Sequence, residues 1–393
     1  MKLALTLMVR DEADIVSSML DHHLAQGVDT IIVTDNGSVD GTAEILRGYA
    51  DRGLIDLRHD PVHRKQQSSV VTAMARDAFT GYGADWVINA DADEFFVPVD
   101  RGITLHEAFE NIPKAIQAFL VPVTNLTGPP ARSGSGLGRL RYRDLRSDEQ
   151  LAGAGLRAHP TADAVHIGTA DVDVIQGNHF VSLESLGAPA EEFAIEVLHL
   201  PWRSYEQFRN KVEISGRAYE SNPHLTPSPN HHGMRDYARL KDGLLEDHYL
   251  LRHPAADELA TGLAEGWFAE ETILADGLAP AVADVEFTAQ ELAEHARVAP
   301  ALRDSEARYG AAQKRYDALV VSTDETVAGL HDELDTAAAR IADLEARILH
   351  LEQLDDLTRA HVETLESRIR DLSGRWEVRV SNRVRRDQRR VAR

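Results

Sequence analysis

The chain has 393 residues and a formal net charge of −22, and this length predicts two or three structural units. A protein this acidic repels a phosphate backbone, so we expect no nucleic acid among its partners. It contains no cysteine, which excludes disulfides and thiolate metal sites and permits a cytoplasmic location. The apolar run at residues 3–9 is short and is followed by the acidic segment at residues 11–14. We therefore expect no signal peptide there, and no run is long enough to span a membrane.

Strand and helix patterns alternate over the first hundred residues. Patterns typical of strands occupy residues 3–9, 30–34, 55–58 and 85–90, and helical patterns occupy residues 14–26, 42–50 and 68–79. This order predicts an α/β fold, with a mostly parallel sheet and helices on both faces. Ligands of such sheets bind at the carboxyl ends of the strands. Arg10-Asp11, Asp35-Asn36 and Asp91-Ala92-Asp93 fall at those ends.

The middle of the chain is less regular. Residues 127–160 are rich in glycine, proline and serine, and they carry Arg132, Arg139, Arg141, Arg143 and Arg146. Two interpretations are equally favoured: a mobile basic lid over an anionic donor, or an ordinary surface loop. We expect strands to resume at residues 172–175 and 194–199, with helices after them.

The C-terminal quarter has a different pattern. Apolar or small residues recur at alternating intervals of three and four, at Val327, Leu330, Leu334, Ala337, Ile341, Leu344, Ile348, Leu351, Val362, Leu365, Ile369 and Leu372. Such heptads predict a coiled coil, interrupted at Asp355 and Thr358, and therefore a homo-oligomer. The last fifteen residues hold seven arginines and one aspartate. This basic tail could bind an anionic membrane at its inner face, nucleic acid or the acidic body of the protein, or it could be disordered.

The segment from Asp91 to Phe96 carries the strongest chemical signal. Asp91 and Asp93 follow an apolar strand, so their side chains are expected to project to the same side. Two carboxylates this close repel each other unless a cation compensates them. A divalent ion such as Mn²⁺ or Mg²⁺, bridging them to a diphosphate, meets that need.

A second chemical signal lies in the turn after the strand at residues 30–34. Asp35 can accept a hydrogen bond from a base N–H, which favours a uracil-type contact. Asp40 precedes a helix, and capping of that helix is its simplest role.

Four ordered segments resemble family 2 glycosyltransferases of the GT-A fold, especially the branch with a D-x-D-E-F motif. They are residues 9–12, 35–42, 86–95 and 199–211, and the resemblance covers roughly residues 1–250. It implies a metal-dependent transferase that moves a sugar from a nucleotide-sugar donor, such as a UDP-sugar, to a saccharide or lipid-linked acceptor. It also implies inversion at the anomeric carbon and a role in cell-surface polysaccharide or glycoconjugate synthesis.

The resemblance implies a role for each matching residue. Asp35 would contact the base, and Asp91 would face the ribose or a metal-bound water. Asp91 and Asp93 form the acidic part of the metal site, with His199 as a further ligand. Arg203 and Lys211 would neutralise the diphosphate, and Arg10 belongs to the donor-binding set. Ser204 and Gln207 also fit a helix capping box.

The sequence does not identify the catalytic base. Glu184, Glu191, Glu192 and Glu196 lie in the appropriate part of the chain, and none is favoured over the others. Gly177-Asn178-His179 could line the acceptor site or form a plain turn. Two other functions stay open: a sugar nucleotidyltransferase, and an oligomeric scaffold with an inactive transferase domain. We expect a transferase domain at residues 1–250, a helical extension or linker at 251–300, the coiled coil at 301–373 and the basic tail at 374–393.

Overall fold

The computed structural model describes residues 1–61, 67–175, 177–221 and 232–391. The chain divides into two compact units, unit 1 from Met1 to Ala312 and unit 2 from Gln313 to Arg393. All strands that the structure describes belong to unit 1. Residues 251–300, which we expected to form a linker or extension, are part of this compact unit.

The main sheet of unit 1 has six strands in the order β3-β2-β1-β4-β10-β6. Their bounds are β1 (Leu3–Val9), β2 (Thr30–Asp35), β3 (Asp56–His59), β4 (Trp86–Ala90), β6 (Ala118–Val121) and β10 (Asp163–Ile167). Strands β1 to β4 are parallel, and β10 runs antiparallel to its two neighbours. The four N-terminal strands predicted from the sequence are confirmed, with bounds that differ by one residue at most.

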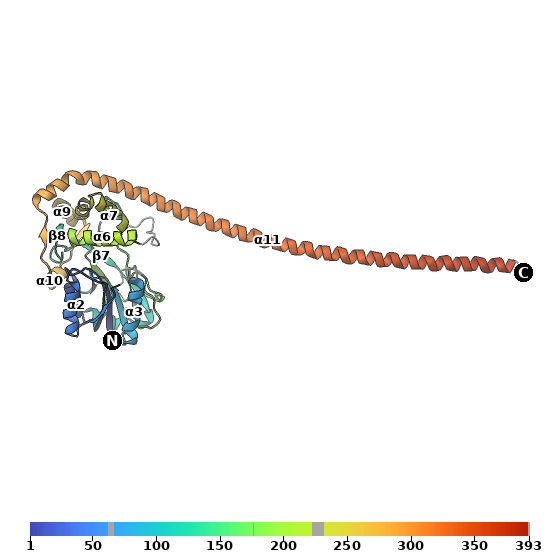
Figure 1. Ribbon diagram of the computed structural model, residues 1–393, viewed down its shortest axis with the longest axis horizontal. Coiled ribbons are helices and arrows are strands. Elements are labelled where there is room, and N and C mark those ends of the chain that lie inside the picture. Colours follow the sequence, from blue (N-terminus) through green and yellow to red (C-terminus); the bar gives the residue numbers. More distant parts are fainter. Residues whose placement is uncertain (62–66, 176, 222–231, 392–393) are drawn as a thin grey trace. The chain divides into compact units, whose positions relative to one another are not determined.

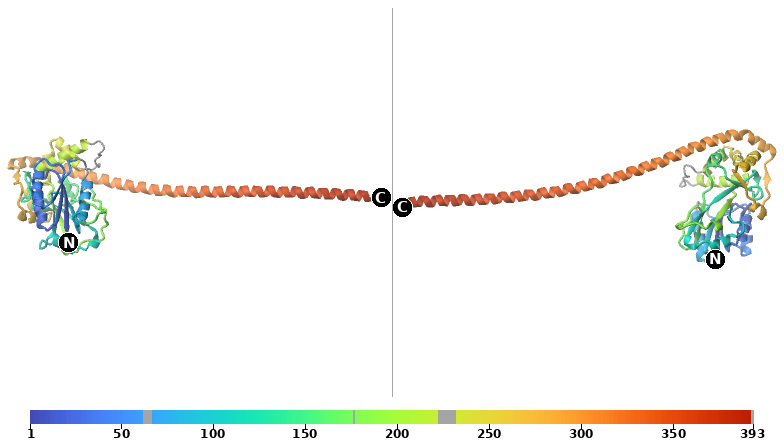
Figure 2. Two further views of the ribbon diagram at one scale, coloured as in Figure 1. Left: turned by 60° about the horizontal axis from the view of Figure 1, so that its bottom comes forward. Right: turned by 180° about the vertical axis from the view of Figure 1, so that it is seen from behind.

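Helices cover the two faces of this sheet. The alternating side chains of β1 explain the arrangement, since Leu3, Leu5 and Leu7 face one core and Ala4 faces the other. Helices α1 (Val16–Ala25), α2 (Thr42–Asp51) and α4 (Leu105–Asn111) contribute to the first core, and α3 (Gln67–Thr80) packs on the opposite face. Figures 1 and 2 show the sheet between α2 and α3. The α/β fold class is confirmed.

A second sheet joins residues from distant parts of the chain, in the order β12-β9-β7-β11-β5. Its strands are β5 (Glu94–Pro98), β7 (Val123–Thr127), β9 (Tyr142–Asp144), β11 (Ile195–His199) and β12 (Phe268–Glu270). Only residues 91–93 separate the end of β4 from the start of β5, so the chain passes from the main sheet to the second sheet at these residues. Strands β8 (Ala131–Ser133) and β13 (Val285–Glu286) form a separate pair.

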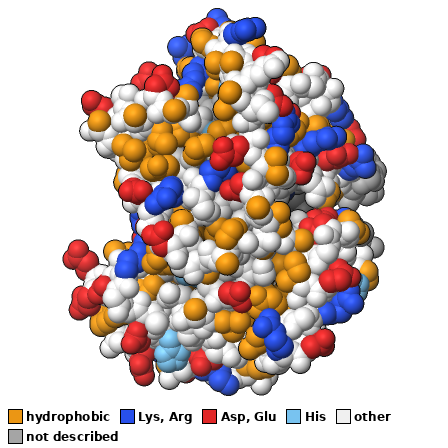
Figure 3. Space-filling model, turned by 90° about the vertical axis from the view of Figure 1, so that its left-hand side faces the viewer, with side chains coloured by type: hydrophobic (Ala, Val, Ile, Leu, Met, Phe, Trp, Pro, Cys, Tyr) orange, Lys and Arg blue, Asp and Glu red, His pale blue; other side chains and the backbone are white. Residues whose placement is uncertain are grey.

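The remaining elements of unit 1 are mostly helical. They are η1 (Lys114–Ile116), α5 (Asp148–Gly153), η2 (Glu191–Phe193), α6 (Tyr205–Ser221), α7 (His232–Lys241), α8 (Leu245–Arg252), α9 (Ala256–Glu265) and α10 (Ile273–Gly277). Helices α6, α7 and α8 share a third core that includes Phe208, Tyr237 and Tyr249. Acidic and basic side chains are interspersed over the face shown in Figure 3.

The middle of the chain differs from the expectation at one strand. Residues 127–160 include β8, β9 and α5, and the five arginines named above are paired with carboxylates of the same chain, which favours the surface interpretation over the basic lid. Residues 172–175 form no strand; Val174 pairs only with Val181, in an isolated antiparallel bridge. The strand expected at residues 194–199 is confirmed as β11.

A single helix, α11 (Ala289–Val391), fills the C-terminal quarter over 103 residues. It extends beyond the expected coiled coil at both ends and includes most of the basic tail. Its heptad residues are exposed, as Leu334 at 66% and Leu351 at 62% illustrate. No helix among the described residues is long and apolar enough to cross a membrane. Self-association of α11 remains a prediction.

Candidate active site

The carboxyl ends of β1, β2 and β4 meet at one edge of the main sheet, because β1 pairs in parallel with both of the other strands. Residues 10–14, 36–41 and 91–93 follow these ends. Ligands of open α/β sheets bind at this edge. The candidate site is therefore formed by these three segments and by the residues that contact them.

Hydrogen bonds hold the first two segments together. Asp11, whose φ is 55°, accepts a bond of 2.7 Å at Oδ1 from the backbone N–H of Val39. Asp40 accepts bonds of 3.0 Å from the backbone N–H groups of Thr42 and Ala13. Thr42 is the first residue of α2 and Gly41 is its N-cap residue, so Asp40 supports the start of the helix from one position before the cap.

Asp35 lies at the end of β2 and is only 4% exposed. Its Oδ1 accepts a bond of 3.1 Å from the backbone N–H of Ser38, and its Oδ2 lies 3.2 Å from Nδ1 of His59. The side chain of His59 is 62% exposed. His59 has no role in the sequence-based prediction, because only the pairing of β2 with β3 brings it opposite Asp35.

Asp91 and Asp93 lie in the turn between β4 and β5, not on a strand with alternating side chains. The backbone N–H of Asp91 donates to Oε2 of Glu94 at 2.8 Å, and the backbone N–H of Glu94 donates to the carbonyl oxygen of Asp91 at 3.2 Å. The two aspartates are nevertheless close: burial raises the pKa of Asp91, and the charge of Asp93 raises it further. The turn, and not the pleat of a strand, brings them together.

Asp93 is buried, with only 1% of its surface exposed, so it does not face an open cleft. Three cationic or polar nitrogens surround its Oδ2: Nζ of Lys211 at 3.1 Å, Nη1 of Arg203 at 3.3 Å and Nε2 of His199 at 3.7 Å. Burial alone would raise the pKa of Asp93, but Lys211, His199 and Arg203 together hold it well below the usual range. Asp93 is therefore ionised at neutral pH.

His199 reaches Asp93 because β11 pairs with β5 in a register that places His199 opposite Glu94. On its other side, β11 pairs with β7, and Nδ1 of His199 lies 2.9 Å from Oδ1 of Asn125. An amide oxygen can only accept, so Nδ1 donates to Asn125, and Nε2 is the nitrogen that faces Asp93. The sequence-based expectation that His199 lies near the aspartates is confirmed.

The residues present fit part of a divalent metal site. Asp93 and His199 offer an oxygen and a nitrogen 3.7 Å apart, a spacing that one ion about 2.1 Å from each can bridge. An outer partner such as Asn125 is typical of metal-binding histidines. Asp91 is not positioned as a third ligand, because its Oδ1 accepts bonds from Gln67 and Asn178. Among the described residues, no three histidines or carboxylates are grouped to hold an ion.

Arg203 is fully buried and contacts three carboxylates from two separate loops. It donates to Oδ2 of Asp14 at 2.9 Å, to Asp93 at 3.3 Å and to Oε2 of Glu12. Its charge is thus matched inside the protein, and it is not exposed to contact a diphosphate. Glu12 and Asp14 received no role from the sequence, since their partner lies about 190 positions away. Burial raises the pKa of Glu12 to about 6, against the lowering effect of Arg203 and Lys211.

Two other basic residues at this edge remain accessible. The side chain of Lys211 is 51% exposed, and that of Arg10 is 30% exposed with Nε 3.7 Å from Asp11. Burial opposes the charged form of Lys211, but Asp93 and Glu12 raise its pKa above the usual value. Ser204 caps α6 by accepting from the backbone N–H of Gln207 at 3.3 Å. The side chain of Gln207 donates to Glu12, so only the Ser204 half of the expected capping box is present.

The four glutamates considered as catalytic base lie outside this cluster. Glu191 and Glu192 are exposed in η2, at the end of β11 opposite to His199, and Glu184 is exposed in a loop. Glu196 is bound by Arg143 and Arg101 at 2.7 Å each. Burial would raise the pKa of Glu196, but these arginines lower it. Successive strand residues face opposite sides, so Glu196 points away from the side of β11 that carries His199.

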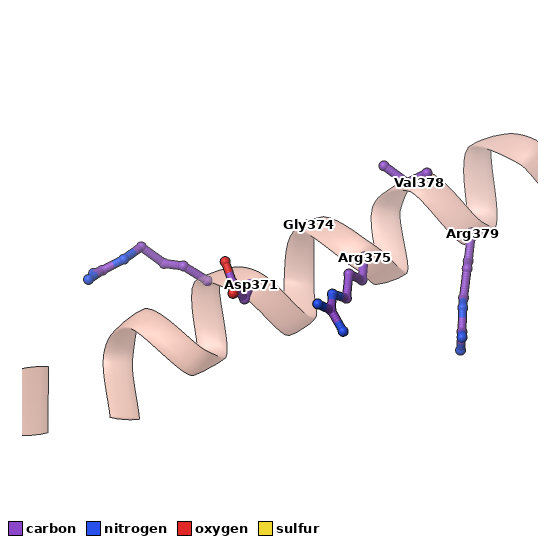
Figure 4. A pocket seen from close by; sticks show the side chains of 6 residues that line it. Asp371, Gly374, Arg375, Val378 and Arg379 are labelled. Atoms are coloured by element: carbon purple, nitrogen blue, oxygen red, sulfur yellow. The ribbon is translucent and has the colours of Figure 1, made fainter. Parts of the chain in front are cut away.

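One pocket lies away from this edge. Figure 4 shows it on α11, where the side chains that line it come from a single helix and point in different directions. These residues are Arg370, Asp371, Gly374, Arg375, Val378 and Arg379. A single helix cannot enclose a small molecule, so this pocket is not a competing active site.

One family model matches part of this chain. Residues 6–124, which include β1, β2, β4 and the turn at 91–93, match the model of glycosyltransferase family 92. No curated protein matched the chain. The chain resembles S. aureus TarS 1–349 with 13% identity and a TM-score of 0.31, over 67% of this chain and 74% of that chain. For the complex of TarS 1–349 with UDP, identity is 14% and the TM-score 0.32, over 67% and 72%. At these TM-scores, the structural similarities carry no functional argument.

Proposed function

We propose that this chain is a metal-dependent glycosyltransferase of the GT-A fold that uses a nucleotide-sugar donor, with UDP as the favoured nucleotide. The proposal rests first on the match of residues 6–124 to a glycosyltransferase family. It rests also on the edge of the sheet where Asp35, Asp93 and His199 gather. The acceptor would be a saccharide or a lipid-linked saccharide, and inversion is expected at the anomeric carbon.

One observation carries the proposal: an ionised, buried Asp93 lies 3.7 Å from the Nε2 of a histidine whose other nitrogen is fixed by Asn125. Asp93 and His199 would hold Mn²⁺ or Mg²⁺, with Asp91 facing a metal-bound water. A bound divalent ion stabilises the negative charge of a leaving diphosphate. Imidazole beside carboxylate suits Mn²⁺ somewhat better than Mg²⁺.

The accessible residues have distinct roles in this proposal. Asp35 and the exposed His59 would bind the base, and Lys211 and Arg10 would bind the phosphates. Arg203 would act only by holding Glu12, Asp14 and Asp93 in place. The positive charge of Lys211 is already 3.1 Å from Asp93, so donor binding must draw the ammonium partly toward the diphosphate.

A donor-binding experiment tests this proposal. The full chain is titrated with UDP, GDP and TDP sugars, with and without Mn²⁺, while its melting temperature and donor hydrolysis are followed. Ligand binding to the folded state raises stability by mass action. We expect one donor class to raise the melting temperature only with metal. Asp93→Asn and His199→Gln should lower hydrolysis by at least about 100-fold. Stabilisation by donor that does not change with metal or in these variants would refute the metal site.

We propose also that α11 forms a coiled-coil homodimer. The exposed heptad residues support this, because a lone helix would leave a continuous apolar stripe in water. In a parallel dimer, the two basic tails would emerge together and could hold the enzyme at an anionic, cytoplasmic membrane surface. A lipid-linked acceptor would be found there.

A further inference from the structure

The segment after β10 brings a histidine to the same edge of the sheet. Gly177 has a φ of 85° and Asn178 a φ of 61°, a backbone conformation that non-glycine residues seldom adopt. A Cβ at Gly177 would lie 3.1 Å from Nε2 and Cδ2 of His179. Position 177 therefore suits glycine for two reasons: its backbone angle and the space that the His179 ring needs. The segment is a turn, closed by the bond of 3.1 Å from the backbone N–H of Asn178 to the carbonyl oxygen of Ile175, and it carries His179.

Two hydrogen bonds orient these residues toward the candidate site. Asn178 is 1% exposed, and its Nδ2 lies 3.3 Å from Oδ1 of Asp91. Nδ1 of His179 lies 3.0 Å from Oδ1 of Asp163, the first residue of β10. Asp163 is fully buried, while the His179 side chain is 36% exposed. The ring is thus anchored from inside the protein and accessible from outside.

This pair resembles the arrangement by which a buried carboxylate prepares an imidazole as a base. When Nδ1–H of His179 donates a hydrogen bond to Asp163, the lone pair of the neutral ring is at Nε2. A buried aspartate at Nδ1 fixes the tautomer and stabilises the imidazolium that forms on proton uptake. Asp163 itself cannot touch a substrate, because it is buried.

The strand order places this pair on the acceptor side of the site. Asp35 ends β2, Asp91 follows β4, and Asp163 begins β10, in a sheet ordered β3-β2-β1-β4-β10-β6. A nucleotide whose base binds at Asp35 and whose diphosphate lies near Asp93 presents its sugar toward β4 and β10. Attack with inversion comes from the face of the sugar opposite the diphosphate. The hydrogen bond from Asn178 to Asp91 places the His179 segment beside this edge, whereas Glu184, Glu191, Glu192 and Glu196 do not lie in the cluster.

We propose that His179 is the catalytic base for the acceptor hydroxyl and that Asp163 is its positioning residue. This inference rests on the proposed glycosyltransferase function. Nε2 takes the proton of the hydroxyl as its oxygen bonds to the anomeric carbon. The bond from that carbon to the diphosphate oxygen breaks, and the diphosphate leaves with the electron pair. The hydrogen bond from Asn178 to Asp91 holds the His179 segment in place.

The charges around His179 set the pH dependence of this step. The hydrogen bond with Asp163 raises the pKa of His179, burial opposes this, and the charges of Asp163 and Asp91 raise it further. Only the neutral ring can accept the proton, so the rate should fall as the pH drops below this raised pKa. Asp163→Asn removes one negative charge and should move this acid limb to lower pH, by about one unit.

The test uses the full chain and the nucleotide sugar that it hydrolyses, with water as acceptor. His179→Gln should lower the rate of hydrolysis by at least about 100-fold. The dissociation constant of the donor should change by less than about twofold, which we count as no change. His179→Ala should regain turnover with sodium azide, because azide attacks without losing a proton. His295→Gln is the matched control: Nδ1 of His295 lies 2.9 Å from Oδ1 of Asp247, a similar pair that joins α11 to α8.

The outcomes separate this inference from the function on which it rests. Hydrolysis by His179→Gln at the wild-type rate, or an acid limb that Asp163→Asn leaves in place, overturns the assignment of His179 and leaves the transferase intact. A wild-type chain that binds and hydrolyses no nucleotide sugar overturns the proposed function and this inference with it. Loss of hydrolysis in His295→Gln to the same extent as in His179→Gln overturns the specific role of His179.

Discussion

Arg203 joins segments that are far apart in the sequence through a single buried guanidinium. Removing it leaves Glu12, Asp14 and Asp93 close together without their shared counter-charge. An uncompensated buried charge costs about 3–5 kcal/mol. We therefore predict that Arg203→Met lowers the free energy of unfolding by about this amount, as measured by urea denaturation at pH 7.

Arg209→Met is the control for this prediction, because Arg209 lies close to Arg203 in the sequence, on α6, and is exposed. It should change the free energy of unfolding by less than about 0.5 kcal/mol. Equal stability of the two variants would show that the Arg203 network does not hold the loops together. Arg203 would then be available for the diphosphate-binding role that the sequence suggested.

Asn125 provides a second prediction at the residue level. Its amide oxygen fixes the proton on Nδ1 of His199, and loss of such an outer partner typically costs 10- to 100-fold in metal affinity. We predict that Asn125→Ala weakens Mn²⁺ binding by about this factor, measured by calorimetry in the presence of donor. Asn111→Ala removes an exposed asparagine that bonds only within α4, and it should bind Mn²⁺ normally. Unchanged affinity in Asn125→Ala would remove His199 from the proposed ligand set.

Helix α6 carries Lys211, so its packing controls where this residue lies. At Gly216 of α6, a Cβ would come within 2.1 Å of the ring of Tyr237 on α7. We predict that Gly216→Ala separates these helices and destabilises the protein by about 1–3 kcal/mol, measured by thermal or urea unfolding. Gly48→Ala on α2 is the matched control, since a Cβ at Gly48 meets no atom within 4 Å. This variant should stabilise the protein by about 0.5–1 kcal/mol. The same sign for both variants would contradict this account of the α6–α7 contact.

The sequence predicted well the elements that are determined by the residues of a short segment alone. Strands β1, β2 and β4 have strong apolar patterns and end at turn residues, so their carboxyl ends, and with them Asp35 and Asp91, could be located. His199 was placed correctly for the same reason. The partners of Arg203 could not be predicted, because Glu12 and Asp14 are brought to it by pairing across about 190 positions. The sequence could not decide between a basic lid and a surface loop at residues 127–160 for a similar reason: apart from Arg146, the five arginines considered there have acidic partners in distant segments.

At the level of the whole molecule, the first turns of α11 belong to unit 1. Glu306 is 4% exposed, and its carboxylate lies 2.7 Å from both Arg235 and Arg239 of α7. A truncation before residue 306 would leave these arginines without their buried partner. Removal of unit 2 should therefore begin after Ala312, where the compact unit ends.

The last prediction concerns the assembly of the full chain. We predict that the full chain is a dimer by light scattering, and that residues 1–312 form a monomer that still hydrolyses soluble donor. Leu344 lies in the heptad stripe and is 49% exposed, whereas Leu349 lies outside it and is 57% exposed. Leu344→Glu should weaken the dimer, because it would bury a charge in the seam, and Leu349→Glu should not.

Anionic liposomes at low salt test the membrane proposal separately, because each basic residue near such a surface contributes about 1 kcal/mol. The full dimer should bind these vesicles, and binding should be lost after the tail beyond residue 378 is removed. A monomeric full chain, or equal effects of Leu344→Glu and Leu349→Glu, would refute the coiled coil. A dimer that does not bind the vesicles would refute only membrane attachment, because the heptad stripe and the arginine tail occupy different parts of α11 and act through different forces.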